Sequence, residues 1–151
     1  MKTDILREYP LDEPGDVNFV FESTMWYRID RDYKTICVND SLKYYTENGS
    51  DSISVGIQRD LNAKYCTSQF YCYAFYINQI FDYMLLDKKF LIRIIINITR
   101  RGIEAGRSIT EIYNSIDDVR KRFLVILASP IGIVLSNMDK KKYKIEKNKH
   151  N

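Results

Sequence analysis

The order of apolar and polar positions divides the chain into a strand-like first part and a helical second part. In residues 1–66 the apolar positions form short runs rich in β-branched and aromatic residues, at 17–21, 25–29, 33–38 and 53–57. Asn48 and Gly49 stand between two strand-like runs, which strongly indicates a β-hairpin. Apolar and polar residues alternate over 53–57, as they do in a half-buried strand. We therefore predict a small antiparallel sheet in residues 1–66.

From about residue 68 the apolar spacing becomes that of helices. One series runs from Phe70 to Leu85, and a second runs from Phe90 to Ile98 after a charged break at 87–89. Apolar side chains on nearly every face of these segments predict helices that are buried on more than one side or that pack on a sheet.

Residues 123–135 are the most apolar segment, and they lie between basic residues on both sides. A membrane-spanning helix needs about 20 apolar residues, so this segment is short for a span. Pro130 at its centre favours a buried helix followed by a strand or a turn. Burial in the core is the favoured interpretation, and membrane contact is the alternative.

Two helix-start signals stand seven residues apart in the middle of the helical half. Ser108 and Glu111 have the Ser-x-x-Glu spacing of a capping box, and Ser115 and Asp118 repeat it with an acid in the first turn. Either a short helix meets a second one here, which is the outline of a helix-turn-helix over 108–128, or one helix carries both serines.

The predicted fold class is therefore α+β, with an N-terminal antiparallel sheet in 1–66 and a helical region in 67–138. The end of the chain differs in charge, because residues 140–151 hold six lysines and one glutamate, which leaves 17 basic and 19 acidic residues before them. A lysine- and asparagine-rich segment without an apolar period is typical of disorder. We predict a disordered basic tail over 139–151, with a phosphate-binding arm as the alternative.

The composition argues against catalysis. The single histidine is His150, in the tail, so a serine or cysteine nucleophile has no imidazole base within the folded part. Cys37, Cys66 and Cys72 show no C-x-x-C spacing, and no glycine-rich phosphate loop is present. We predict a protein that is not an enzyme and uses no cofactor and no metal. Free thiols and the polar start of the sequence, unlike a signal peptide, predict a cytoplasmic location.

The basic residues after Ser115 suggest one binding function. If a recognition helix begins there, Arg120, Lys121 and Arg122 spread over most of a turn, and an outward arginine can contact phosphates or base edges of DNA. The competing interpretation is an amphipathic helix whose solvent face is basic, and on this segment alone it is favoured.

The segment Ser108-Ile-Thr-Glu-Ile112, followed by Val-Arg-Lys-Arg-Phe123, resembles the first helix-turn-helix of AraC/XylS-type transcription regulators. Residues 12–21 resemble the "GD-apolar" strand of the sensor domain in that family. The resemblance implies a truncated or diverged regulator that binds DNA, or acts on a full-length regulator protein. Arg120, Lys121 and Arg122 would then hold the DNA-contacting positions.

Two rival functions stay open. Gly102-Ile-Glu-Ala-Gly-Arg107 resembles the Gly-x-Asn-Trp-Gly-Arg box of Bcl-type cell-death regulators of large DNA viruses. In that family the arginine pairs with an aspartate of a partner helix in an apolar groove. The strand-like first third does not suit that all-helical fold, so this function ranks second. The third possibility is a small non-enzymatic protein-interaction module.

Overall fold

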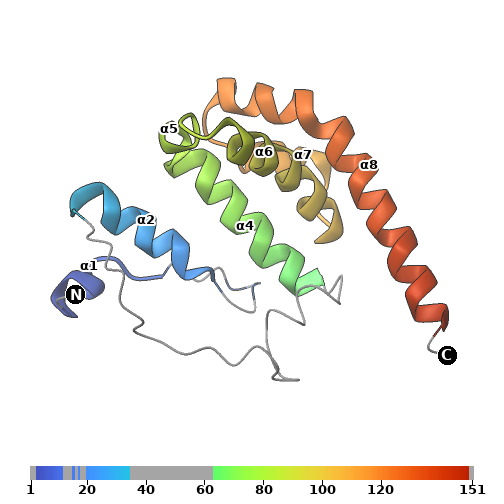
Figure 1. Ribbon diagram of the computed structural model, residues 1–151, viewed down its shortest axis with the longest axis horizontal. Coiled ribbons are helices and arrows are strands. Elements are labelled where there is room, and N and C mark those ends of the chain that lie inside the picture. Colours follow the sequence, from blue (N-terminus) through green and yellow to red (C-terminus); the bar gives the residue numbers. More distant parts are fainter. Residues whose placement is uncertain (1–2, 12–14, 16, 18–19, 35–62, 150–151) are drawn as a thin grey trace.

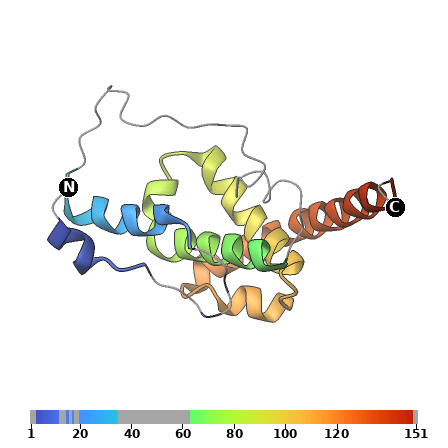
Figure 2. The ribbon, with the colours of Figure 1, turned by 90° about the horizontal axis from the view of Figure 1, so that it is seen from below.

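The computed structural model describes residues 3–11, 15, 17, 20–34 and 63–149, and every regular element in these residues is a helix (Figure 1). The helices are α1 (Thr3–Glu8), α2 (Glu22–Asp32), α4 (Ala63–Gln79), α5 (Phe81–Met84), α6 (Lys88–Glu104), α7 (Ile109–Asn114) and α8 (Val119–Lys149). Helices α4, α6 and α8 pack together, and α2 lies beside α4 (Figures 1 and 2).

The predicted α+β class is wrong for the part of the chain that the structure describes. Residues 25–29, expected as a strand, lie in α2, where Met25 and Ile29 follow the N-cap residue Phe21 at intervals of four residues and Ile29 is buried. The β-branched and aromatic content suggested a strand, but the same run also has helical spacing, and packing against α4 decides between the two. The hairpin at Asn48 and Gly49 and the strand at 53–57 lie outside the described residues.

The predicted helical series of the second half are confirmed. The first forms α4 and α5, and the second forms α6, whose start is capped by Asp87 through Oδ1, which accepts hydrogen bonds from the amides of Lys89 and Phe90. The apolar positions of α4 and α6 meet in one core, together with residues of α7 and the start of α8. This core includes Phe70, Ile77, Ile80, Ile94, Ile98, Ile112, Ile116 and Val125.

The region 108–128 contains two helices rather than one. The capping box of Ser108 and Glu111 is present at the start of α7: the serine side chain accepts from the Glu111 amide, and the glutamate accepts from the Ser108 amide at 2.7 Å. Ser115 does not start a helix but ends α7. Asp118 caps α8 instead, because its Oδ1 accepts from the amides of Arg120 and Lys121.

The last helix is longer than the sequence suggests. The expected disordered tail from residue 139 continues α8 as far as Lys149, and Pro130 lies inside the helix rather than at its end. The C-terminal part of α8 extends beyond the other helices in both views (Figures 1 and 2). In the described residues, no helix combines the length and apolar content needed to cross a bilayer.

Candidate functional site

An apolar cavity lies between the segment that leads into α2 and one side of α4. Its volume is about 400 Å³, which is within the range of ligand-binding pockets. Most lining side chains are apolar, and the polar ones are short or amides. The described lining residues are Val17, Val20, Phe21, Thr24, Ser68, Tyr71, Cys72, Ala74, Phe75, Asn78, Gln79 and Ser115.

The wall of the cavity is held by contacts between α2 and α4. The Ser23 hydroxyl lies 2.8 Å from the Tyr76 hydroxyl, and Arg31 donates from Nη1 to the Gln79 carbonyl at 2.9 Å. The rings of Tyr27 and Tyr76 meet edge to face, with centroids 5.5 Å apart. Helix α2 is therefore fixed along α4, and the cavity is bounded by elements with defined mutual positions.

Arg107 lies against one lining residue. Its Nη2 donates to the Tyr71 hydroxyl at 3.1 Å, and its guanidinium carbon lies 5.6 Å from the centre of the Tyr71 ring and 5.9 Å from that of Phe70. Arg107 is only partly buried. A guanidinium has five N–H donors, so this position places a cationic, multidentate donor beside the cavity.

Two glycines bring Arg107 to this place. Gly106 has a φ of 79°, which ends α6 in a conformation that favours glycine. A Cβ on Gly102 would lie 2.6 Å from the side chain of Ile112, so the missing side chain lets α7 pack closely on α6. The spacing of the two glycines therefore has a structural cause, which is the sharp return from α6 into α7.

The described lining residues of the cavity include no carboxylate and no imidazole. Burial raises the pKa of the Cys72 thiol to about 11, so this sulfur is protonated at neutral pH and is a poor nucleophile. Among the described residues, no three His, Cys, Asp or Glu side chains gather in a way that could hold a metal ion. The arrangement is therefore suited to binding apolar groups.

Asn78 joins the cavity to the connection between α7 and α8. Its Nδ2 donates to the Ser115 carbonyl at 2.9 Å, and its Oδ1 accepts from the Asp117 amide at 3.1 Å. This paired contact crosses 37 and 39 residues of sequence. Asn78 thus fixes the α7–α8 connection against α4 at the end of the cavity.

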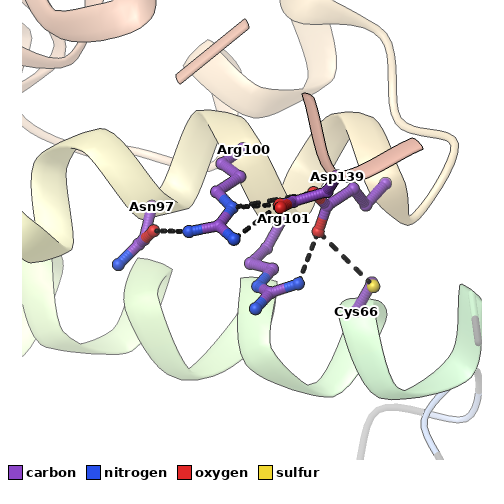
Figure 3. A network of polar contacts seen from close by, with 6 residues as sticks. Cys66, Asn97, Arg100, Arg101 and Asp139 are labelled. Atoms are coloured by element: carbon purple, nitrogen blue, oxygen red, sulfur yellow. Dashed lines mark hydrogen bonds and ion pairs between the residues drawn. The ribbon is translucent and has the colours of Figure 1, made fainter. Parts of the chain in front are cut away.

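A buried ionic network joins α4, α6 and α8 (Figure 3). Glu104 is its centre: the carboxylate side chain is 1% exposed, accepts from Arg101 Nη1 at 2.6 Å, and lies 3.8 Å from the Cys66 sulfur. Burial raises the pKa of Glu104 although the Arg101 charge lowers it. Arg100 extends the network to α8 by donating from Nε to Asp139 at 2.6 Å.

The structure separates the three basic residues predicted to contact DNA. Arg120 is exposed at the start of α8. Lys121 instead turns toward α4, where its Nζ donates to the Asn78 carbonyl at 3.1 Å and lies 5.1 Å from the centre of the Phe81 ring. Arg122 is partly buried, and its Nη2 donates to the Ile116 carbonyl at 2.8 Å. The three side chains do not form one exposed cluster.

Sequence reasoning missed the cavity because it assigned residues 17–21 to a strand, whereas Val17, Val20 and Phe21 line the cavity opposite residues of α4. One signal for the site was in the sequence: the Bcl-type resemblance rests on Gly102, Gly106 and Arg107. The partner of Arg107 within the chain, Tyr71, has no sequence signature, because only the packing of α6 on α4 brings the two residues together.

In the described residues, fold and site together define a helical protein with an apolar cavity whose wall residue Tyr71 contacts Arg107. Comparisons with protein-family models, with curated proteins and with solved structures find no match to this chain. Both family resemblances therefore stay predictions.

Proposed function

We propose that this chain is a non-enzymatic protein that binds a helix of another protein in the cavity between α2 and α4. The observation that carries the proposal is the apolar cavity with Arg107 fixed against its wall residue Tyr71. An amphipathic helix binds a groove by placing a few apolar side chains into it. The partner is therefore a helix with an apolar face and an acidic residue that meets Arg107.

The resemblance to Bcl-type regulators supports this proposal. The argument against it was the strand-like first third, of which residues 22–32 form the helix α2. The glycines of the resembling segment also have the structural roles of ending α6 and allowing α7 to approach. We further propose that the protein acts in the cytoplasm, which the buried free thiols of Cys66 and Cys72 support.

The charge pairing can be tested with a synthetic helical peptide that carries leucines at i, i+3 or i+4, and i+7, and one aspartate. We expect the peptide to bind, and Arg107→Glu to weaken binding about tenfold or more, because two carboxylates would then face each other. Exchanging the peptide aspartate for lysine should restore binding to Arg107→Glu. Isothermal titration calorimetry measures each combination.

Arg93→Glu is the matched control, because Arg93 is an exposed arginine of α6 and does not line the cavity. It should leave peptide affinity unchanged. Val20→Lys, which puts a charge into the apolar lining, should abolish binding with either peptide. Absence of binding by the native chain, or equal losses in Arg107→Glu and Arg93→Glu, would count against the groove.

DNA binding, directly or with a full-length regulator protein, is a second candidate, and the connection of α7 to α8 through a short turn favours it. In that case Arg120→Ala should lower the affinity for a mixed-sequence duplex more than Lys121→Ala or Arg122→Ala does, because only Arg120 is exposed. Fluorescence anisotropy at two salt concentrations measures this, since phosphate contacts weaken steeply with salt. Affinity that is absent, or equal in all three variants, argues against this candidate.

A further inference from the structure

Helix α8 buries its small side chains and exposes its large ones. Ser129, Gly132 and Ser136 face the bundle with Val125, and a Cβ on Gly132 would lie 2.8 Å from the Ile96 carbonyl oxygen of α6. An amphipathic helix in a globular protein normally turns its large apolar side chains to the core. The small residues allow a close approach to α6, and they leave the large apolar side chains on the outside.

The outer face of α8, as we call it, is a row of apolar residues that are each 53–61% exposed: Phe123, Leu127, Ile131, Val134 and Met138. Their spacing of three or four residues places them along one side of the helix, over a length of about 22 Å. Contiguous exposed apolar surface of this kind marks a contact with another molecule or with a membrane.

Both ends of the outer face are basic. Arg120 is exposed before Phe123, and Lys140, Lys141 and Lys142 are exposed after Met138. Between residues 119 and 145 the only carboxylate is Asp139, which is paired with Arg100 at the side of α8 that faces α6.

The two aspartates just before α8 do not change this charge pattern. Asp118 turns its carboxylate to the amides of the helix start, and Asp117 precedes the helix. The partner of the outer face should therefore be apolar along its middle and negatively charged around it.

A second copy of the chain does not meet this requirement. Parallel pairing of two outer faces would bring the lysines at 140–142 together, and antiparallel pairing would bring Arg120 close to Lys141 of the other copy. Both arrangements place like charges close together at the edge of the apolar contact, and such juxtaposition disfavours pairing.

An anionic lipid surface has the required chemistry. An interfacial helix buries apolar side chains at the boundary between headgroups and acyl chains, while lysine and arginine reach the phosphates. Each basic residue near such a surface adds to binding. We propose that α8 binds an anionic membrane surface in the plane of the membrane, through its outer face and its basic ends.

The fold allows this contact without rearrangement. The inner side of α8 stays on α6, so only side chains that are already exposed would enter the lipid. The C-terminal part of α8 projects beyond the bundle (Figures 1 and 2), and Lys140, Lys141 and Lys142 at its start are exposed. The contact lies apart from the cavity between α2 and α4, because none of the described lining residues of that cavity belongs to α8.

Flotation of the full chain with vesicles tests the proposal. The native protein should float with vesicles of phosphatidylserine and phosphatidylcholine and stay unbound with phosphatidylcholine alone. Leu127→Ser/Val134→Ser should reduce the bound fraction at low lipid concentration more than about tenfold, because two large apolar side chains no longer enter the lipid. Lys141→Gln and Lys142→Gln should each weaken binding about fivefold.

The matched control is Leu86→Ser, because Leu86 is 86% exposed but lies between α5 and α6. It should bind as the native chain does, and circular dichroism should show the same helical content in all variants. Three results would overturn the proposal: no flotation of the native chain, unchanged flotation of Leu127→Ser/Val134→Ser, or an equal loss in Leu86→Ser. Self-association that Leu127→Ser/Val134→Ser abolishes, without vesicle binding, would make the outer face a protein interface instead.

Discussion

Gly132→Ala is expected to lower the free energy of unfolding by about 2 kcal/mol, although alanine is the better helix former by about 1 kcal/mol. The added Cβ would lie 2.8 Å from the Ile96 carbonyl oxygen and 2.9 Å from Cβ of Thr99. The first of these is a backbone atom, so α6 and α8 must move apart to relieve the clash. Urea denaturation followed by circular dichroism measures the change.

Asn137→Ala is the control for this experiment, because Asn137 is exposed on α8. Its effect should stay within about 0.5 kcal/mol. If Gly132→Ala proves as stable as the native chain, α6 and α8 do not approach as closely as described. The close approach would then not explain why the outer face is exposed.

Arg101→Met is expected to lower the free energy of unfolding by about 3 kcal/mol at neutral pH, because it leaves the buried Glu104 carboxylate without its closest cation. Glu104 is 1% exposed on its side chain, and Arg101 donates to it at 2.6 Å. Arg100, whose Nε lies 3.7 Å from the other carboxylate oxygen, limits the loss. Chemical denaturation over a range of pH measures both the size of the effect and its titration.

The contribution of Glu104 to stability changes with pH in a defined direction. The folded-state pKa of Glu104 is raised, so the folded protein holds this proton to higher pH than the unfolded chain does. The contribution of Glu104 to stability is therefore greatest below the ordinary glutamate pKa and falls as the pH rises to the raised value. In Arg101→Met this fall should be larger, because the charge that lowers the Glu104 pKa is gone.

Glu104→Gln separates charge from shape in the same network. It should remove this part of the pH dependence, and Arg101→Met/Glu104→Gln should recover part of the stability that Arg101→Met loses, since no buried charge remains unpaired. If the free energy of unfolding of Arg101→Met differs from that of the native chain by the same amount at every acid pH, then Glu104 does not titrate in the folded protein.

The wrong assignment of residues 25–29 to a strand shows the limit of what the local residue pattern can predict. Residues 25–29 have the β-branched and aromatic content of a strand, yet Met25 and Ile29 also stand one helical turn apart. Strand propensity depends strongly on context, so it does not decide between the two structures. The contact of Tyr27 with Tyr76 forms when residues 25–29 are helical, and it joins residues 49 positions apart, so the local sequence pattern does not predict it.

The sequence by itself determined the local features of the helical half. The capping box of Ser108 and Glu111 and the two helical series before it depend on side chains within a few residues of each other, so their spacing was sufficient.

Only the tertiary structure decided which side chains are exposed and which meet. The apolar segment 123–135 was predicted to be core, but Gly132 and the serines of α8 pack closely on α6 and turn Phe123, Leu127 and Ile131 outward. Lys121, one of the three residues predicted to contact DNA, donates from Nζ to the Asn78 carbonyl of α4, a contact that the sequence does not predict. Burial depends on the shape of the neighbouring helix as much as on hydrophobicity, and that shape is formed by residues distant in the sequence.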